Sequence, residues 1–356
     1  MNRILKYLYI TFTLTTGVLL SGCDVHEWPN MQNYETYGLH LTFETDLPQW
    51  EHYINTRAVA LPETKAALDY GLIRYIVRAY PLHDGTVDKA WSDEFVFMRD
   101  AAEGYDCDLQ IELKSGRYRL IVWSDIFEHE GTDPYYSAED FGEISLQGAH
   151  APNTDYRDAF RGSLDVEVQT SIDEHAMPVG TITMQRPLAK FEFVSNDLIE
   201  FFEREARNAE LRSAEAAASA DTSTLDASQT HVSLEDYEIV FSYVGFMPNA
   251  YSIFTDKPAD SATGVQFRSH FTQLSDEEAS LGFDYVFVNG SETAVTVQIA
   301  LYSPESDTPI SLTEPIDVPL RRSSHTVIRG SFLMTQASGG TGIDPGYDGN
   351  HNVILP

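Results

Sequence analysis

One cysteine stands where its thiol could be acylated. Residues 20–22, Leu-Ser-Gly, precede Cys23, and an aliphatic residue, two small residues and a thiol in this order are typical of a lipobox. Arg3 and Lys6 begin the chain with positive charge, and the uncharged run 7–20 is shorter than the ~20 residues of a bilayer span. We therefore expect a signal peptide over residues 1–22 and palmitate-type acylation of Cys23, which would anchor the chain in the outer membrane. The alternative is an ordinary secretory peptide with an incidental cysteine.

A second position suited to processing is Arg57. It lies in the polar stretch INTRAVALP (54–62), where a proline follows and exposure to a protease is expected. The alternative is an ordinary surface arginine.

A third group of residues carries oxygen atoms at alternate positions of a glycine-rich segment. The residues are Asp344, Asp348, Asn350 and Asn352, within DPGYDGNHN (344–352). Such oxygens could bind calcium, but the downstream bidentate glutamate of an EF-hand loop is missing, and Pro-Gly and Asp-Gly are also ordinary turn sequences. A turn is the favoured interpretation, and we expect neither a metal nor a cofactor.

Motifs of established catalytic chemistry are missing from the sequence. It holds no HExxH zinc motif, no GxSxG nucleophile elbow, no SxxK and no phosphate-binding loop. Acidic pairs are expected by chance among 55 Asp and Glu residues, so they do not indicate a glycosidase. We predict that the chain is not an enzyme, and a lipid-anchored hydrolase stays a minor hypothesis.

The net charge of −32 argues against a nucleic-acid partner, because the chain would be repelled by phosphate backbones. An acidic and aromatic segment, SDIFEHEGTDPYY (124–136), follows a strand-like run and is predicted to be a loop that is either solvated or in contact with a ligand. Trp123 and Cys107 lie in apolar alternating runs and are predicted core residues.

The elements that position these residues are predicted to be strands. Apolar and polar residues alternate in many short runs, and turn residues separate them. These runs are 37–45, 72–80, 93–99, 107–113, 117–125, 162–168, 180–186, 189–195, 237–246, 265–271, 283–289, 293–302, 325–334 and 351–356. The pattern predicts an all-β fold of two β-sandwich domains rather than a βαβ fold.

The domain boundary is predicted near Arg186, where a proline interrupts the alternation. After the tether 23–36, the first domain would span residues 37–185 and the second residues 186–356.

One helix is predicted near the start of the second domain, over residues 198–218, with Asp197 as its cap. Apolar residues form one stripe along it. They are Leu198, Phe201, Phe202, Ala206, Ala209 and Leu211. With the polar segment 219–230, this helix would form an insertion over residues 197–230.

Several of these segments together resemble a known family. In chain order they are the lipobox with CDVHEWP (23–29), GRYRLIVWSD (116–125), DAFRG (158–162), RPLAKFEF (186–193) and RGSFLMTQASGGTGIDPGYDGNHNVILP (329–356). The chain resembles fimbrillin-like and anchor-like lipoproteins of the type V fimbrial superfamily of Bacteroidales. The helical insertion and the CDVHEW opening depart from its major subunits and known anchors, and are closer to an uncharacterised side branch.

The resemblance implies two tandem transthyretin-like (Greek-key) sandwiches and a non-catalytic role in surface fimbriae or adhesion. In that family, polymerising subunits are cut after an arginine, lose their first strand and accept a strand of another subunit, whereas anchors keep their lipid. Arg57 matches the cleavage position by its place after the first strand, and the last strand, 351–356, would complete its own sheet or act as a donor. Partners would be the outer membrane, fimbrial subunits, and host or bacterial surface ligands. The alternative is a glycan-binding surface lipoprotein of a polysaccharide-uptake system.

Overall fold

The structure is a computed structural model. It describes residues 34–43, 71–169, 179–219, 233–289, 293–304, 306–335 and 352–354. In this part of the chain strands predominate and there is one α-helix, so the predicted all-β class is confirmed. No helix among these residues is long and apolar enough to cross a membrane.

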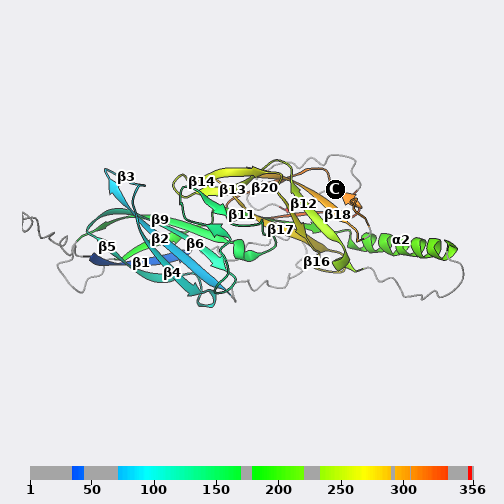
Figure 1. Cartoon of the computed structure of the whole chain (residues 1–356), viewed down its shortest axis with the longest axis horizontal. Coiled ribbons are helices and arrows are strands. Elements are labelled where there is room, and N and C mark those ends of the chain that lie inside the picture. Colours follow the sequence, from blue (N-terminus) through cyan, green and yellow to red (C-terminus); the bar gives the residue numbers. More distant parts are fainter. Residues whose placement is uncertain are drawn as a thin grey trace, which may run out of the picture.

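The strands up to residue 184 form what we call the N-terminal half, drawn from blue to green in Figure 1. The longer ones are β1 (Tyr34–Phe43), β2 (Leu72–His83), β4 (Asp93–Asp100), β5 (Cys107–Lys114), β6 (Gly116–Phe127), β9 (Ala159–Val168) and β10 (Val179–Met184). Short strands are β3 (Thr86–Val87), β7 (Tyr136–Ser137) and β8 (Ile144–Leu146). One sheet has the order β10-β1-β5, and the facing sheet has the order β4-β2-β6-β9 with β3 beside the end of β2.

The strands from residue 188 onward form the C-terminal half. They are β11 (Leu188–Ser195), β12 (Glu238–Tyr243), β13 (Phe246–Ser252), β14 (Lys257–Thr263), β15 (Gln266–Ser269), β16 (Thr272–Gln273), β17 (Ala279–Phe287), β18 (Thr293–Tyr302), β19 (Ser311–Leu312), β20 (Ile316–Leu320), β21 (His325–Gly330) and β22 (Asn352–Ile354). One sheet is β16-β17-β11-β21-β22, and the other is β15-β12-β18 with β19 and β20 both beside β18.

The two halves repeat one strand order. In each half the first strand lies between an antiparallel and a parallel neighbour, β5 and β10 for β1, and β17 and β21 for β11. In the facing sheets, β4-β2-β6-β9 corresponds to β15-β12-β18-β20. The match extends over seven strands of each half, although no repeat is visible in the sequence.

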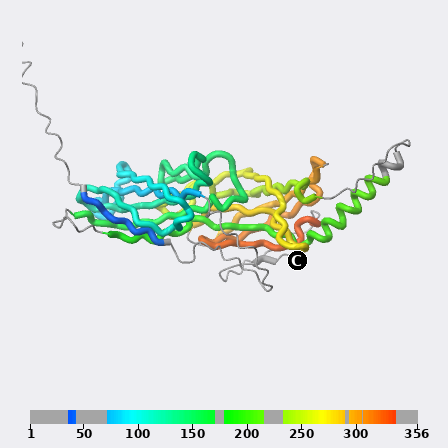
Figure 2. The backbone as a smooth tube through the Cα atoms, turned by 90° about the horizontal axis from the view of Figure 1, so that it is seen from below, coloured from blue at the N-terminus to red at the C-terminus, as the bar shows by residue number. Residues whose placement is uncertain are grey.

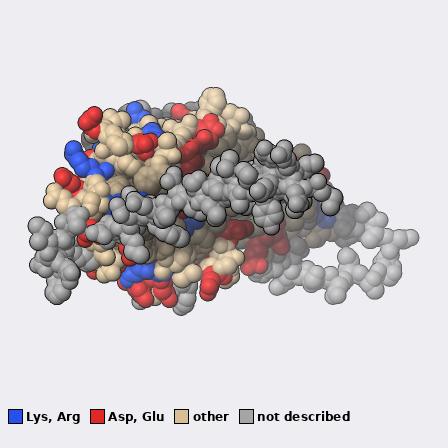
Figure 3. Space-filling model, turned by 60° about the vertical axis from the view of Figure 1, so that its left-hand side comes forward, with Lys and Arg blue, Asp and Glu red and all other residues tan. Residues whose placement is uncertain are grey.

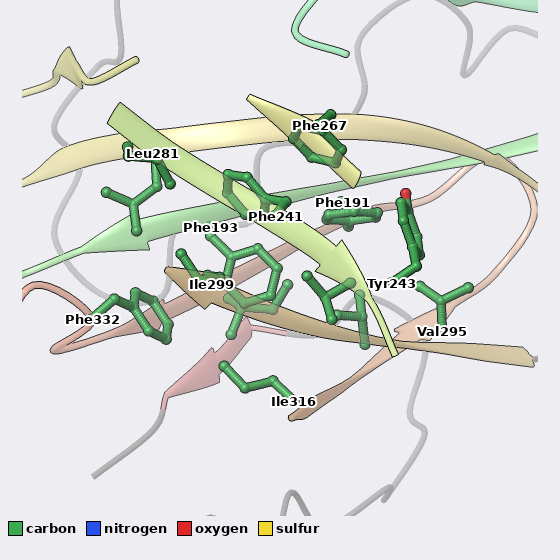
Figure 4. Packing of buried hydrophobic residues seen from close by; sticks show 14 of the residues in the cluster. Phe191, Phe193, Phe241, Tyr243, Phe267, Leu281, Val295, Ile299, Ile316 and Phe332 are labelled. Atoms are coloured by element: carbon green, nitrogen blue, oxygen red, sulfur yellow. The ribbon is translucent and has the colours of Figure 1, made fainter. Parts of the chain in front are cut away.

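Each pair of sheets encloses its own apolar core. In the C-terminal half the core contains closely packed aromatic rings, among them Phe193, whose ring centroid lies 5.8 Å from that of Phe241 and 5.4 Å from that of Phe332 (Figure 4). In the N-terminal half, Cys107 is 5% exposed and lies in the core, as predicted.

A third core joins the two halves. Trp123 is fully buried there, as predicted, and its ring packs edge-on against Tyr136, which in turn packs on Phe287 of the C-terminal half. A small sheet also crosses the junction, because β8 pairs with β13. The two halves therefore lie end to end in one elongated body (Figure 1).

Buried charges reinforce this junction. Arg157 of the N-terminal half pairs with Asp284 of the C-terminal half, and both side chains are almost fully buried. Burial alone would raise the pKa of Asp284, but Arg157 and His150 outweigh it and hold that pKa below its ordinary value. Arg186, at the predicted boundary, is also buried and donates to both carboxylate oxygens of Asp158.

The α-helix α2 (Leu198–Ser219) begins where predicted and stands away from the body at the far end of the C-terminal half (Figure 2). Only its first part packs on the core, because Leu198 and Phe201 are buried whereas Leu211 is 59% exposed. The predicted stripe is therefore wrong at Leu211, and also at the exposed Ala206. The Asp197 carboxylate accepts hydrogen bonds from the backbone N–H groups of Leu333 and Met334. These bonds connect the start of the helix to the segment that follows β21.

Two other predictions need correction. The run 237–246 is interrupted by a turn, so β12 ends at Tyr243 and β13 starts at Phe246. In the predicted loop 124–136, the strand β6 continues to Phe127, and Asp125 is buried in an ion pair with Arg74. The distance between Asp125 Oδ2 and Arg74 Nη2 is 2.6 Å, so this carboxylate serves the sheet rather than a ligand.

Candidate functional site

The first strand, β1, is the feature that best fits an exchangeable element. It lies in the middle of a three-stranded sheet, paired antiparallel with β5 along residues 34–41 and parallel with β10 along residues 38–43. In the sequence, 27 residues separate its last residue, Phe43, from Gly71, with which the next described segment begins. We call the groove between β5 and β10 that β1 occupies the β1 seat.

Alternate side chains of β1 fill this seat. Tyr37, Leu39 and Leu41 point into the core and are 6%, 1% and 0% exposed. Burial of each such side chain is worth roughly 1.5–3 kcal/mol. Their opposite neighbours on β5 are the apolar Ile111, Leu109 and Cys107, so the seat has an apolar floor and two hydrogen-bonding edges.

A glycine shapes the seat at its β10 side. A Cβ atom on Gly180 would lie 2.7 Å from the hydroxyl oxygen of Tyr37 and 2.6 Å from Cδ2 of Leu164. Tyr37 therefore fits over a position that only glycine leaves open. Burial raises the pKa of Tyr37, so this phenol stays neutral as it packs there.

The outward face of β1 is only partly covered. His40 lies opposite Asp108 of β5, and Nδ1 of His40 is 2.6 Å from Oδ1 of Asp108. The two side chains are 40% and 86% exposed, so water screens this pair and it adds little stability. β1 is therefore stabilised in the sheet by one buried face and by two rows of backbone hydrogen bonds.

Asp and Glu outnumber Lys and Arg in the sequence, 55 to 23. Figure 3 shows a face on which Asp and Glu side chains lie in several separate groups among uncharged ones. Among the described residues, no group of three or more His, Cys, Asp or Glu side chains could hold a metal ion. Among the same residues, the exposed Phe and Trp rings are Trp91, 47% exposed in the N-terminal half, and Phe246, 73% exposed in the C-terminal half.

The other end of the chain also forms a strand. β22 pairs in parallel with the edge of β21, with Val353 opposite Ile328. It contains Asn352, one of the residues considered for calcium, whose backbone here belongs to a sheet. The predicted last strand, 351–356, is thereby confirmed over residues 352–354.

The predicted site residues lie outside the described part of the chain. They are Cys23, Arg57, Asp344, Asp348 and Asn350. Acylation, cleavage and calcium binding therefore remain predictions. Gly180 was not predicted as a site residue. A signal was present, because glycine is unfavourable inside an alternating run and often marks a place where another side chain comes close.

The fold and this site define an elongated all-β protein whose first strand fills a seat between two other strands. The chain belongs to the family described as "Family of unknown function (DUF6562)", whose sequence profile matches residues 33–356. The comparison with curated proteins finds no match.

Several solved structures are similar to this chain, and two of them are described as fimbrial proteins. The fimbrial anchor protein Mfa2 from Porphyromonas gingivalis is 13% identical, with 78% of this chain and 81% of that chain covered and a TM-score of 0.37. A fimbrial assembly protein from Parabacteroides distasonis is 10% identical, with 83% of this chain and 91% of that chain covered and a TM-score of 0.34.

Proposed function

We propose that this chain is a lipoprotein of the outer membrane, exposed at the cell surface and held by acyl groups on Cys23. It acts as a fimbrial anchor, tip or minor subunit, or as a related adhesin, without catalysis. The observation that carries the proposal is the β1 seat, in which one strand at the start of the chain completes a sheet between two others. The lipobox and the ordered family motifs of the sequence support it.

The seat suits exchange for a physical reason. Without β1, the facing N–H and C=O groups of β5 and β10 would lose their partners, and the apolar floor under Leu39 would meet water. An incoming strand restores both kinds of contact at once, with backbone bonds for affinity and alternate side chains for specificity. Arg57 lies between β1 and β2 in the sequence, so a cut after it would leave β1 bound by non-covalent contacts alone.

The two halves are proposed to be tandem transthyretin-like sandwich domains that meet near Arg186. Their shared strand order supports this, because a first strand flanked by one antiparallel and one parallel neighbour occurs in both. The helix α2 and the residues up to 230 would be an insertion in the second domain.

The first test is mass spectrometry of the intact N-terminus of the native protein from the cell surface. An acylated Cys23 at the start would mean that β1 stays in place, which identifies an anchor or a non-polymerising adhesin. A start at Ala58 would mean that lipid and β1 are removed, which would overturn the proposed attachment through Cys23 and identify a polymerising subunit instead. An unacylated N-terminus at any other residue would contradict the proposal.

Matched variants separate cleavage from general degradation. Arg57→Ala should abolish a start at Ala58, whereas Lys65→Ala, a loss of positive charge eight residues further on, should leave it unchanged. A deletion strain gives the functional readout, and we expect weaker adhesion or altered fimbriae. Unchanged adhesion, together with purified fimbriae that lack this chain, would overturn the proposal.

A further inference from the structure

The strand β4 has an edge that no described strand covers. It pairs with β2 on one side, from Asp93 opposite Ala79 to Asp100 opposite Leu72. On its other side, no pairing exists within the described ranges of the chain. Alternate residues along this eight-residue strand therefore direct their backbone N–H and C=O groups to an open edge of the sheet.

This edge is apolar on both faces. Val96 and Met98 point outward and are 53% and 46% exposed, while Phe95 and Phe97 point inward and are only partly buried. Four consecutive apolar residues on an open edge strand are a template for strand pairing, which monomeric proteins normally avoid. Such a run contrasts with the acidic composition of the chain, whose net charge is −32.

The C-terminal half shows that the fold does not require this run. Its strand β15 occupies the same place beside β12 but has only four residues. Arg268 projects outward from β15, is 71% exposed and pairs with Glu238, so this edge is short and charged. The apolar composition of β4 is thus specific to the N-terminal half.

We propose that β4 pairs antiparallel with β4 of a second copy of this chain, around a twofold axis at Val96. In this arrangement Val96 lies opposite Val96 of the second copy, and Phe95 lies opposite its Phe97. Asp93 lies opposite Arg99 of the second copy, whose guanidinium also pairs with Glu103 of its own chain, so residues of opposite charge face each other at both ends of the pair. Asp93 also has a buried oxygen, Oδ2, to which no described residue donates a hydrogen bond.

Charge selects this register over its neighbours. Side chains opposite one another in a sheet point to the same face. The twofold axis can therefore pass through a residue, such as Phe95, Val96 or Phe97, but not between two residues. An axis at Phe97 would place Glu94 opposite Asp100, two like charges, which is unfavourable. An axis at Phe95 would leave Met98 outside the paired segment and shorten the contact.

Cysteine cross-linking on cells tests the register in the full chain. Val96→Cys brings two thiols face to face across the axis, where Cα atoms of opposite residues are about 4.5–5.5 Å apart, a distance that a disulfide spans. Met98→Cys is the matched control, because Met98 lies opposite Glu94 and far from its own copy. On oxidation we expect at least tenfold more covalent dimer from Val96→Cys than from Met98→Cys, and a mixed dimer when Met98→Cys and Glu94→Cys are expressed together. No dimer, equal yields at both positions, or a cross-link to a different protein would overturn the proposal.

A second measurement does not depend on oxidation. Sedimentation of the detergent-solubilised full chain should give the mass of a dimer, and Val96→Lys should convert it to a monomer by placing two lysines opposite each other. Val179→Lys, at a 61% exposed position on β10, should leave the dimer intact. A monomeric parent protein, or an equal effect of the two lysines, would also overturn the proposal.

Discussion

The strands β1 and β11 occupy the same place in the two halves but are held very differently. Each lies between an antiparallel and a parallel neighbour. β1 buries one face, and its outward His40 is 40% exposed, whereas seven of the eight residues of β11 are buried. In the chain, β11 continues from β10 after three residues and leads directly to α2.

The difference supports β1, rather than β11, as the strand that an exchange would replace. Loss of β11 would expose the aromatic core around Phe193 and the polar contacts of Lys190 and Glu192 on its other face. Loss of β1 would uncover mainly the apolar floor beneath Tyr37, Leu39 and Leu41. The same topology thus gives a permanent core strand in one half and a strand suited to exchange in the other.

The largest expected effect is at the centre of the permanent strand. Phe193→Ala should lower the free energy of unfolding by about 3–5 kcal/mol, because it removes a fully buried ring and leaves a cavity between Phe241 and Phe332. Urea unfolding followed by circular dichroism measures this. Phe246→Ala, at a 73% exposed ring, is the control and should change stability by less than about 0.5 kcal/mol. A loss below about 1 kcal/mol for Phe193→Ala would mean that the core is not as tightly packed as described.

The next effect concerns acid stability of the permanent strand. Burial alone would raise the pKa of Glu192, but His325 and the Ser280 hydroxyl outweigh it and lower that pKa from 4.5 to about 2. Because the folded pKa lies below the unfolded one, the carboxylate stabilises the fold fully above pH ~4.5, and this contribution is lost as the pH falls towards 2. It amounts to about 3 kcal/mol.

Glu192→Gln should therefore be less stable than the parent protein at pH 7, and the difference should shrink between pH 4.5 and 2. Denaturant unfolding at several pH values measures it. Asp108→Asn removes a carboxylate that is 86% exposed beside β1, so its stability should follow the parent at every pH within about 1 kcal/mol. Equal pH profiles for Glu192→Gln and the parent would show that Glu192 is not the group that titrates in this range.

The smallest effect tests the fit of β1 in its seat. Gly180→Ala places a methyl group 2.7 Å from the Tyr37 hydroxyl and 2.6 Å from Leu164, and should cost about 1–3 kcal/mol. The loss should be local, so we expect faster amide hydrogen exchange in β1 with little change in β11. Adding Tyr37→Phe, which removes one of the two close contacts, should restore part of the protection.

Gly245→Ala is the control for this test, because its new methyl group would meet nothing within 4 Å. Uniformly faster exchange in both halves would contradict a role of Gly180 that is confined to the β1 seat.

The parts of the fold that could be predicted from the sequence were those with a strong local pattern. Alternation located most long strands to within a few residues, such as β18, because one face of each meets a core and the other does not. It missed short strands such as β7 and β8, whose two or three residues carry too little periodicity. The helical spacing of apolar residues predicted that Leu211 is buried, but the outer part of α2 has no described sheet beneath it.

The sequence by itself determined the all-β class, the helix predicted over residues 198–218 and the burial of Trp123 and Cys107, because these follow from the polarity of near neighbours. Tertiary structure decided what depends on residues far apart in the chain. Arg157 and Asp284 meet across 127 positions of sequence, and Tyr37 packs over Gly180 only once β1 lies beside β10. The different cover of β1 and β11 was decided at this level too, since the two strands share a pattern of pairing and differ only in what packs against them.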